Sequence, residues 1–175
     1  MDLLITHYLY YNIAHRNPTL DFMIFLSAEI FPYVFALGIW AWFLIRKRSR
    51  QVIFIGLVGL ASAFVSRFII VTIVRFFVER SRPFAELDLT PVFSHDPSNS
   101  FPSGHAAFFF ALIPVMLVFS KKAGLIFSVI AIAMALSRVI AGVHWFSDVL
   151  VGGLIGLFIG HILMILYIYR YSSKI

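Results

Sequence analysis

The chain has 175 residues, of which 61% are hydrophobic and 13% charged, with a net charge of +6 and no cysteine. A soluble domain carries about 25% charged and about 45–50% apolar residues, so this apolar excess indicates a membrane protein. The lack of cysteine excludes disulfides, thiolate metal sites and a catalytic thiol. The basic residues flank or interrupt apolar runs, where membrane orientation and anion binding explain them better than nucleic acid, so we expect no nucleic-acid partner.

Residues 1–18 predict a helix at the membrane interface rather than a cleaved signal peptide. The segment contains Asp2, several tyrosines and two histidines, and it lacks a basic start followed by an apolar run. Its apolar and aromatic side chains are typical of a helix at the level of the lipid headgroups. The alternative, in which part of this segment crosses the membrane as a sixth span, stays open.

Five apolar stretches approach or reach the length of about 20 residues that a membrane-spanning helix needs. They cover about residues 21–45, 51–77, 104–120, 123–142 and 148–169. No soluble domain, low-complexity segment or repeat interrupts them. We therefore expect a single all-α membrane domain over residues 1–175, with a bundle of five spans, or six if the N-terminal segment inserts.

The basic residues also predict how the chain is oriented. They gather in the first and third connections and in the C-terminal tail, at Arg46, Lys47, Arg48, Arg50, Lys121, Lys122, Arg170 and Lys174. The second connection, residues 78–103, is mixed in charge, and the fourth has no Lys or Arg. By the positive-inside rule the basic connections are cytoplasmic. The second and fourth connections then lie at the outer face of a plasma or inner membrane.

Three segments bring polar residues to that outer face: the end of the second span with its loop, the start of the third span, and the junction of the fourth and fifth. The residues are Arg75, Arg82, Ser103, Gly104, His105, Arg138, His144 and Asp148. Each piece alone has an ordinary structural explanation, such as a turn, a helix start or a surface helix pair. Their convergence at one depth favours a functional site, because charged groups near lipid are costly.

These residue types suit phosphoryl transfer. Arginine presents a planar, permanently charged fork that binds phosphate oxygens bidentately. Ser103, Gly104 and His105 begin a helix, whose free N–H groups bind anions. His144 and Asp148 are four residues apart and share a helix face, so the carboxylate can orient the imidazole. His105 is then the candidate acid for the departing oxygen.

The order and spacing of these residues resemble the type 2 phosphatidic acid phosphatase superfamily, membrane lipid phosphatases that share a site with vanadium haloperoxidases. The motifs read Arg75-(six)-Arg82-Pro83, Pro102-Ser103-Gly104-His105 and Ser137-Arg138-(five)-His144-(three)-Asp148. The first motif has Arg75 where the family usually has Lys, and the other two match throughout. The motifs cover residues 75–148, and the helical pattern extends the resemblance to nearly the whole chain.

This resemblance implies a mechanism. His144 attacks phosphorus to form a phosphohistidine, Asp148 orients His144, His105 protonates the leaving group, and water hydrolyses the intermediate. The phosphate is bound by the Ser103 side chain, the Gly104 amide and three arginines, Arg75, Arg82 and Arg138. The family needs no metal, and one carboxylate is too few for a typical Mg²⁺ site, so we expect no cofactor.

The small size resembles the undecaprenyl-diphosphate phosphatases of the bacitracin-resistance type, which recycle the carrier lipid of cell-wall synthesis. Many of that subgroup have Asp at the position of Gly104. Phosphatidylglycerophosphate, phosphatidate and lipid A phosphates are alternative substrates, and a lipid translocator or transporter is the non-enzymatic alternative. We expect the substrate to enter laterally, with its tail still in the bilayer.

Residues outside the motifs give three further expectations. Glu29 and Arg67 lie at similar depths in the first two spans, so we expect an ion pair or a shared hydrogen-bond network that supports the site from beneath. His95 and Asp96 in the outer loop are expected to be solvated. A stripe of small residues on the last span predicts close helix packing, within the chain or between copies in a homo-oligomer, at Gly152, Gly156 and Gly160.

Overall fold

The computed structural model describes residues 2–46 and 50–172, and all the regular structure in these ranges is helical. The elements in chain order are α1 (Asp2–Ile13), α2 (Pro18–Phe25), η1 (Leu26–Ile30), α3 (Phe31–Arg46), α4 (Arg50–Phe64), η2 (Val65–Ile70), α5 (Val71–Phe77), α6 (Pro83–Glu86), α7 (Gly104–Phe119), α8 (Lys121–Ile140) and α9 (Phe146–Ser172). The basic residues Lys47, Arg48 and Lys174 lie outside the described residues.

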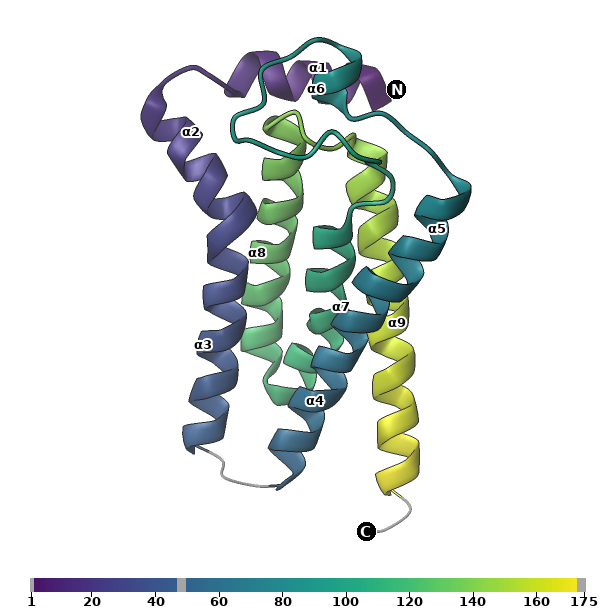
Figure 1. Cartoon of the computed structure of the whole chain (residues 1–175). Coiled ribbons are helices and arrows are strands. Elements are labelled where there is room, and N and C mark those ends of the chain that lie inside the picture. Colours follow the sequence, from purple (N-terminus) through teal and green to yellow (C-terminus); the bar gives the residue numbers. More distant parts are fainter. Residues whose placement is uncertain (1, 47–49, 173–175) are drawn as a thin grey trace.

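The predicted spans correspond to helices. Within the described ranges, four helical stretches are long and apolar enough to cross a membrane, and α7 is a shorter apolar helix. The four are Pro18–Trp42, Arg50–Phe77, Lys121–Ile140 and Phe146–Arg170. The loop after α5 and the turn between α8 and α9 lie at one end of the bundle, and α4 and α8 begin at the other end (Figure 1). This is the alternation of loops that the charge pattern predicted.

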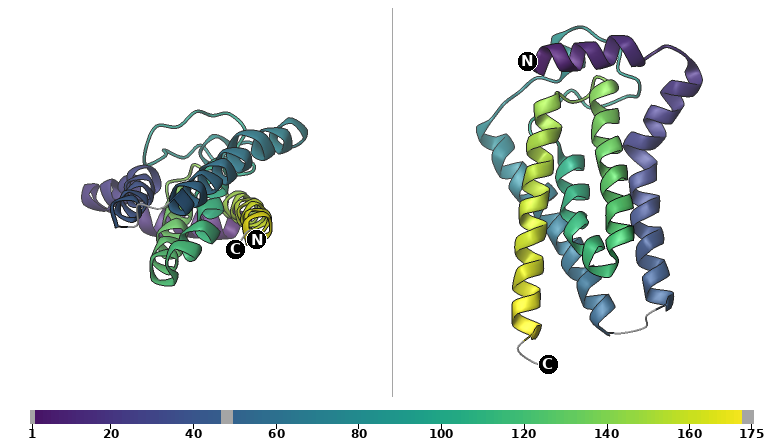
Figure 2. Two further views of the ribbon diagram at one scale, coloured as in Figure 1. Left: turned by 90° about the horizontal axis from the view of Figure 1, so that it is seen from below. Right: turned by 180° about the vertical axis from the view of Figure 1, so that it is seen from behind.

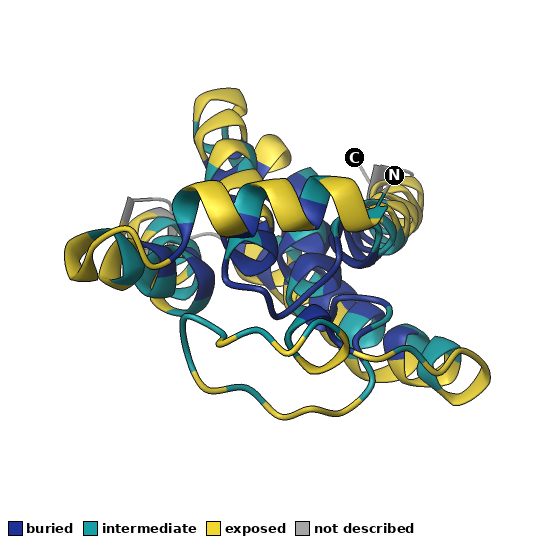
Figure 3. Cartoon of the chain, turned by 90° about the horizontal axis from the view of Figure 1, so that it is seen from above, coloured by how far each residue is buried: buried dark blue, intermediate teal, exposed yellow. Residues whose placement is uncertain are grey.

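The short helix α7 forms the centre of the bundle, with contacts to α4, α8 and α9 (Figures 1 and 2). Its side chains Ala106, Ala107, Phe109 and Ala111 are completely buried. A view down the bundle shows the buried residues gathered around its middle and the exposed ones on the outward faces of the surrounding helices (Figure 3). Because lipid-facing helices need no polar exterior, the outward residues are largely apolar as well.

The glycines of α9 allow that helix to pack directly on the backbone of α7. A Cβ atom at Gly152, Gly156 or Gly160 would collide with the carbonyl oxygen of Ser103, Ala107 or Ala111 respectively. Small residues permit such close approach between helices in membranes. The stripe therefore packs within the chain, which is the first of the two predicted alternatives, and nothing in the contacts of these glycines supports an interface between copies.

Two π-helical turns, η1 and η2, interrupt the first two spans and carry their charged residues, Glu29 and Arg67. The turn η1 packs against α8, whereas η2 packs against α7. Glu29 therefore pairs with Arg138 of α8, at 2.5 Å between Oε1 and Nη1. The predicted Glu29–Arg67 ion pair is wrong, because equal depth does not fix the direction in which a residue faces around the bundle.

Helix α1 lies across the outer-loop end of the bundle (Figure 1) and contacts α8 and α9. Its inner face is anchored by Thr6, which is fully buried, and by Tyr10, whose hydroxyl donates to the Thr90 carbonyl at 2.7 Å. Its outer face exposes large apolar side chains, among them Leu4, Tyr8 and Tyr11. This two-sided helix fits the predicted position at a membrane interface.

Because α9 packs on the backbone of α7, we predict that alanine destabilises the protein at Gly156 but not at Gly38, a glycine of α3 outside this contact. Gly156→Ala puts a Cβ atom against the Ala107 carbonyl. Overpacking of this kind lowers the free energy of unfolding by about 1–3 kcal/mol. Gly38→Ala is the matched control, because a Cβ there meets nothing within 4 Å and alanine favours the helix by up to about 1 kcal/mol. Thermal unfolding in detergent should show a lower midpoint only for Gly156→Ala. Equal midpoints would contradict the direct backbone contact.

Candidate functional site

A polar hollow of about 250 Å³ lies where the three predicted segments meet. Its lining combines arginines and histidines from α5, the outer loop, the start of α7 and the α8–α9 turn: Arg67, Phe68, Val71, Thr72, Arg75, Arg82, His95, Ser98, Gly104, His105 and His144. Most of the predicted site residues are thus brought together, although Ser103, Arg138 and Asp148 lie behind the lining.

His144 presents one ring nitrogen to the hollow and the other to the protein interior. His144 lies in the α8–α9 turn, in which Gly142 has a positive φ of 75°. The His144 side chain is 1% exposed. Its Nε2 lies 3.4 Å from Arg82 Nη1, and its Nδ1 lies 3.5 Å from Asp148 Oδ2. The Nδ1 atom makes no hydrogen bond, so the carboxylate is adjacent to the imidazole but not in hydrogen-bonding geometry with it.

The surroundings of His144 keep its imidazole neutral. Burial lowers the pKa of His144 well below its usual value, and the positive charges of Arg138 and Arg82 lower it further. A neutral imidazole has a free lone pair on one nitrogen. The expected nucleophile therefore carries an unprotonated ring nitrogen at neutral pH, as a nucleophile requires.

Three donors hold the Asp148 carboxylate. Its Oδ2 accepts from the Ser100 hydroxyl at 2.8 Å and from the Trp145 backbone N–H at 2.9 Å. Its Oδ1 accepts from Arg80 Nη1 at 2.8 Å. Because Asp148 is completely buried, these bonds offset the loss of water around the carboxylate. They also fix the direction in which Asp148 faces His144.

Arg80, which the sequence analysis did not identify, connects the site to the N-terminal helix. Its Nη2 pairs with Asp2 Oδ2 at 2.6 Å, and its Nη1 also donates to the Ser147 hydroxyl at 2.6 Å. Burial raises the pKa of Asp2, but hydrogen bonds from Ser147 and Arg80 outweigh it and leave the pKa below its usual value. An ionised Asp2 thus ties α1 to the cation that holds Asp148.

Arg82 and Arg75 are held by backbone oxygens. Arg82 is 2% exposed and donates to the Val143 carbonyl at 2.8 Å, and Arg75 donates to the Pro102 carbonyl at 3.1 Å. Burial, then the charges of Arg75 and Arg138, lower the pKa of Arg82 to about 10, so it is still a cation at neutral pH. The buried Nε atoms of both arginines have no hydrogen-bond partner. Neither guanidinium is therefore fully satisfied by the groups that the structure describes.

Arg138 lies behind the hollow, fully buried, between Glu29 and His95. Its Nη2 lies 2.8 Å from His95 Nε2, and the His95 ring centroid is 6.1 Å from that of His144. Burial, then Arg82 and Arg138, lower the pKa of His95 to about 4, so this ring is neutral and can accept from Arg138. The expectation that His95 is solvated is wrong, because the outer loop folds back over the site. Asp96 is exposed, as expected.

The start of α7 supplies the remaining predicted residues. Ser103 is fully buried, and its hydroxyl caps the helix by accepting from the Ala106 N–H at 3.4 Å. Gly104 and His105 line the hollow, and His105 Nε2 lies 3.7 Å from Glu29 Oε2. Within the described ranges, no group of three or more His, Asp or Glu side chains is arranged to hold a metal ion.

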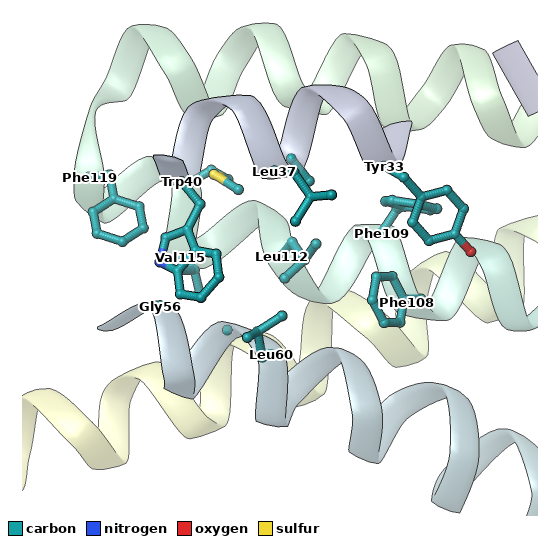
Figure 4. Close-up of a pocket in the computed structure, with 13 residues that line it drawn as sticks. Tyr33, Leu37, Trp40, Gly56, Leu60, Phe108, Phe109, Leu112, Val115 and Phe119 are labelled. Carbon is teal, nitrogen blue, oxygen red and sulfur yellow. The ribbon is translucent and has the colours of Figure 1, made fainter. Parts of the chain in front are cut away.

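An apolar groove of about 110 Å³ lies between α3, α4 and α7 (Figure 4). Tyr33 and Phe108 line the end nearest the site, where the Tyr33 ring centroid is 6.3 Å from that of His105. Trp40 and Phe119 line the far end (Figure 4). One end of this apolar groove therefore lies next to His105, which lines the polar hollow.

Comparisons with known proteins agree with this arrangement. The chain is 34% identical over 141 residues to bacitracin transport permease protein BcrC of Bacillus licheniformis, covering 80% of this chain and 66% of that protein. It is 34% identical over 136 residues to an undecaprenyl-diphosphatase of Sulfolobus acidocaldarius, covering 77% and 64%. The aligned part thus spans slightly less than two thirds of each of these relatives.

Solved structures show the same fold. The crystal structure of Aquifex aeolicus LpxE matches with a TM-score of 0.69 and 28% identity, covering 93% of both chains. The PAP2-type phosphatidylglycerolphosphate phosphatase of Bacillus subtilis matches with a TM-score of 0.68 and 24% identity, covering 99% of this chain and 85% of that one. The family model described as PAP2 superfamily matches residues 56–172, which include all three motifs. The chain is a member of the PAP2 superfamily.

Proposed function

We propose that the chain is a lipid phosphatase that removes the terminal phosphate of a lipid diphosphate at the outer membrane face, through a phosphohistidine on His144. The observation that carries the proposal is the neutral, buried His144 whose Nε2 lies 3.4 Å from Arg82 in an arginine-lined hollow. Nucleophile and phosphate-binding cation are thus adjacent, as phosphoryl transfer requires.

In the first step, the lone pair of His144 Nε2 attacks the terminal phosphorus. The bond from that phosphorus to the bridging oxygen breaks, its electron pair stays on the oxygen, and protonated His105 gives this oxygen a proton. A lipid monophosphate leaves. The Nδ1–H of His144 faces Asp148, which stabilises the cationic ring while it carries the phosphoryl group.

In the second step, water hydrolyses the phosphohistidine. The water oxygen attacks phosphorus and passes a proton to His105, and the phosphorus–nitrogen bond breaks with its electron pair returning to His144. Inorganic phosphate leaves, and both histidines regain their starting states. Arg75 and Arg82 offset the charge on the phosphoryl oxygens in both steps, so the mechanism requires no metal ion.

The apolar groove supports a substrate with a long tail. With the phosphate at His144, the tail can pass Tyr33 and lie along α7 within the bilayer (Figure 4). Relatives named bacitracin transport permease protein and undecaprenyl-diphosphatase support undecaprenyl diphosphate as the substrate. Phosphatidylglycerophosphate, phosphatidate and lipid A phosphates are the alternatives within the family, and parallel assays of these lipids decide among them.

The phosphohistidine is testable with a substrate labelled in its terminal phosphate. Quenching in alkaline detergent, where phosphohistidine survives, should show label on the protein in the presence of excess EDTA. His144→Ala should carry no label and lose more than about 10⁴-fold in kcat. His161→Ala is the control, because that histidine is exposed on α9. Label on His144→Ala, or activity that requires a metal, would contradict the mechanism.

The orientation predicts where the reaction takes place. Farnesyl diphosphate added to intact spheroplasts should release phosphate into the medium, because its charged end reaches an outward site without crossing the bilayer. Inverted vesicles from the same cells should hydrolyse it only after detergent opens them. The opposite result would place the hollow on the cytoplasmic side.

The contacts of Arg80 predict a role in positioning Asp148. Arg80→Gln should lower kcat by about 10–100-fold with little change in KM, because a charge-assisted hydrogen bond to the buried carboxylate is lost. Arg80→Lys should recover part of the loss, and Arg16→Gln is the control at an exposed arginine. A raised KM with unchanged kcat would instead make Arg80 a substrate-binding residue.

A further inference from the structure

Arg67 is a cation inside a membrane span and outside the three family motifs. It lies on the π-helical turn η2, about two helical turns deeper in the span than Arg75. Charged side chains at such positions are costly and usually serve a function. Single π-helical turns are also frequent at functional sites. The motif-based mechanism gives Arg67 no role.

The guanidinium of Arg67 lacks an anionic partner in the described part of the chain. Its Nη1 atom is buried without a hydrogen bond, and its guanidinium carbon lies 5.4 Å from the centre of the Phe68 ring. Glu29, the expected partner, is instead bonded to Arg138 and lies near His105. A buried donor left unsatisfied costs about 1–3 kcal/mol. An anionic ligand at this point would remove that cost.

The side chain of Arg67 runs beside the start of α7. Its Cγ and Nε atoms lie 3.5 and 3.9 Å from the position that a Cβ atom on Gly104 would take. Arg67 lines the same hollow as His105, the proposed proton donor to the leaving oxygen. In an in-line displacement the leaving group lies opposite the nucleophile. Arg67 therefore flanks the side of the hollow into which the leaving group of the reaction extends.

The charge of the hollow suits a diphosphate better than a monophosphate. Arg67, Arg75 and Arg82 line it, and none of them has an ion pair with a carboxylate in the described ranges. A phosphate monoester carries about −1.5 to −2 at neutral pH, and a lipid diphosphate carries about one negative charge more. Three guanidinium groups thus match the larger charge. Arg67 lies deeper in its membrane span than Arg75.

We infer that Arg67 binds the phosphate group next to the lipid tail, called here the proximal phosphate, and so selects lipid diphosphates over lipid monophosphates. This inference rests on the proposed function. When the terminal phosphorus transfers to His144, negative charge develops on the bridging oxygen and the proximal phosphate, and Arg67 stabilises that charge. A lipid monophosphate places no phosphate beside Arg67 and gains nothing from it.

The test compares farnesyl diphosphate with farnesyl phosphate, which have the same tail, in purified protein with EDTA present. The wild type should favour the diphosphate by at least about tenfold in kcat/KM. Arg67→Gln should lose about 10–100-fold on the diphosphate, the range for a charge-assisted hydrogen bond, and less than about threefold on the monophosphate. Arg67→Lys should retain part of the preference. Arg16→Gln, at an exposed arginine, should change neither rate.

The monophosphate rate also reports folding of each variant, since a misfolded site would lose both activities. Equal losses on the two substrates, or a wild type without preference, would overturn the role of Arg67 and leave the proposed function intact. Hydrolysis of either substrate that survives in His144→Ala would instead overturn the proposed function itself.

A second measurement uses the wild type alone. Methylenediphosphonate should inhibit farnesyl diphosphate hydrolysis at least about tenfold more strongly than inorganic phosphate, because only the diphosphonate reaches both Arg82 and Arg67. Farnesyl phosphate should be displaced by both inhibitors from the same site. Equal inhibition by the two would count against a separate position for the proximal phosphate.

Discussion

Repulsion among guanidinium groups is the constraint on which the site depends. Five arginines lie in or around one hollow, in surroundings where burial strengthens every charge interaction. The fold divides them into two groups. Arg80 and Arg138, which do not line the hollow, are paired with carboxylates, whereas the arginines that line it contact backbone carbonyls or an aromatic ring. Positive charge is thus neutralised behind the hollow and left free inside it.

This division explains the positions of the two carboxylates at the site, Glu29 and Asp148. Glu29 neutralises Arg138 and stays near His105, and Asp148 neutralises Arg80 while facing His144. A carboxylate placed inside the hollow would compete with phosphate for the same donors. Both carboxylates instead contact a cation on one side and a histidine on the other. Each can therefore influence a histidine without occupying the proposed phosphate position.

Close backbone packing keeps these groups in register. The Ser103 N–H donates to the Asp148 carbonyl at 3.0 Å, which joins the start of α7 to the start of α9. This bond requires the two helices to approach closely, and Gly152 permits the approach because a Cβ there would strike the Ser103 carbonyl. The glycines of α9 therefore contribute to the site as well as to packing, since His105 and Asp148 lie on the two joined helices.

The sequence predicted the spans and the motif residues because both depend on local information. Helix length, apolar composition and motif spacing are read directly from neighbouring residues, and the motif residues did converge at one end of the bundle. The contacts of Asp2, Arg80 and His95 depend instead on how a loop and an N-terminal helix fold over that end. One feature of the sequence could have identified Arg80: it is a basic residue that lies between the two arginines of the first motif, Arg75 and Arg82.

The incorrect prediction that Glu29 pairs with Arg67 shows that equal depth in the membrane does not identify a contact. Counting residues along a span gives height in the bilayer, but the π-helical turns η1 and η2 change the direction in which the following residues face. Glu29 was therefore turned toward α8 and Arg67 toward α7. Had the two paired, Arg138 would have lacked its carboxylate and the hollow would have lost a free cation. The separation of Glu29 from Arg67 is thus what leaves a third guanidinium without a carboxylate partner in the hollow, where we propose that phosphate binds.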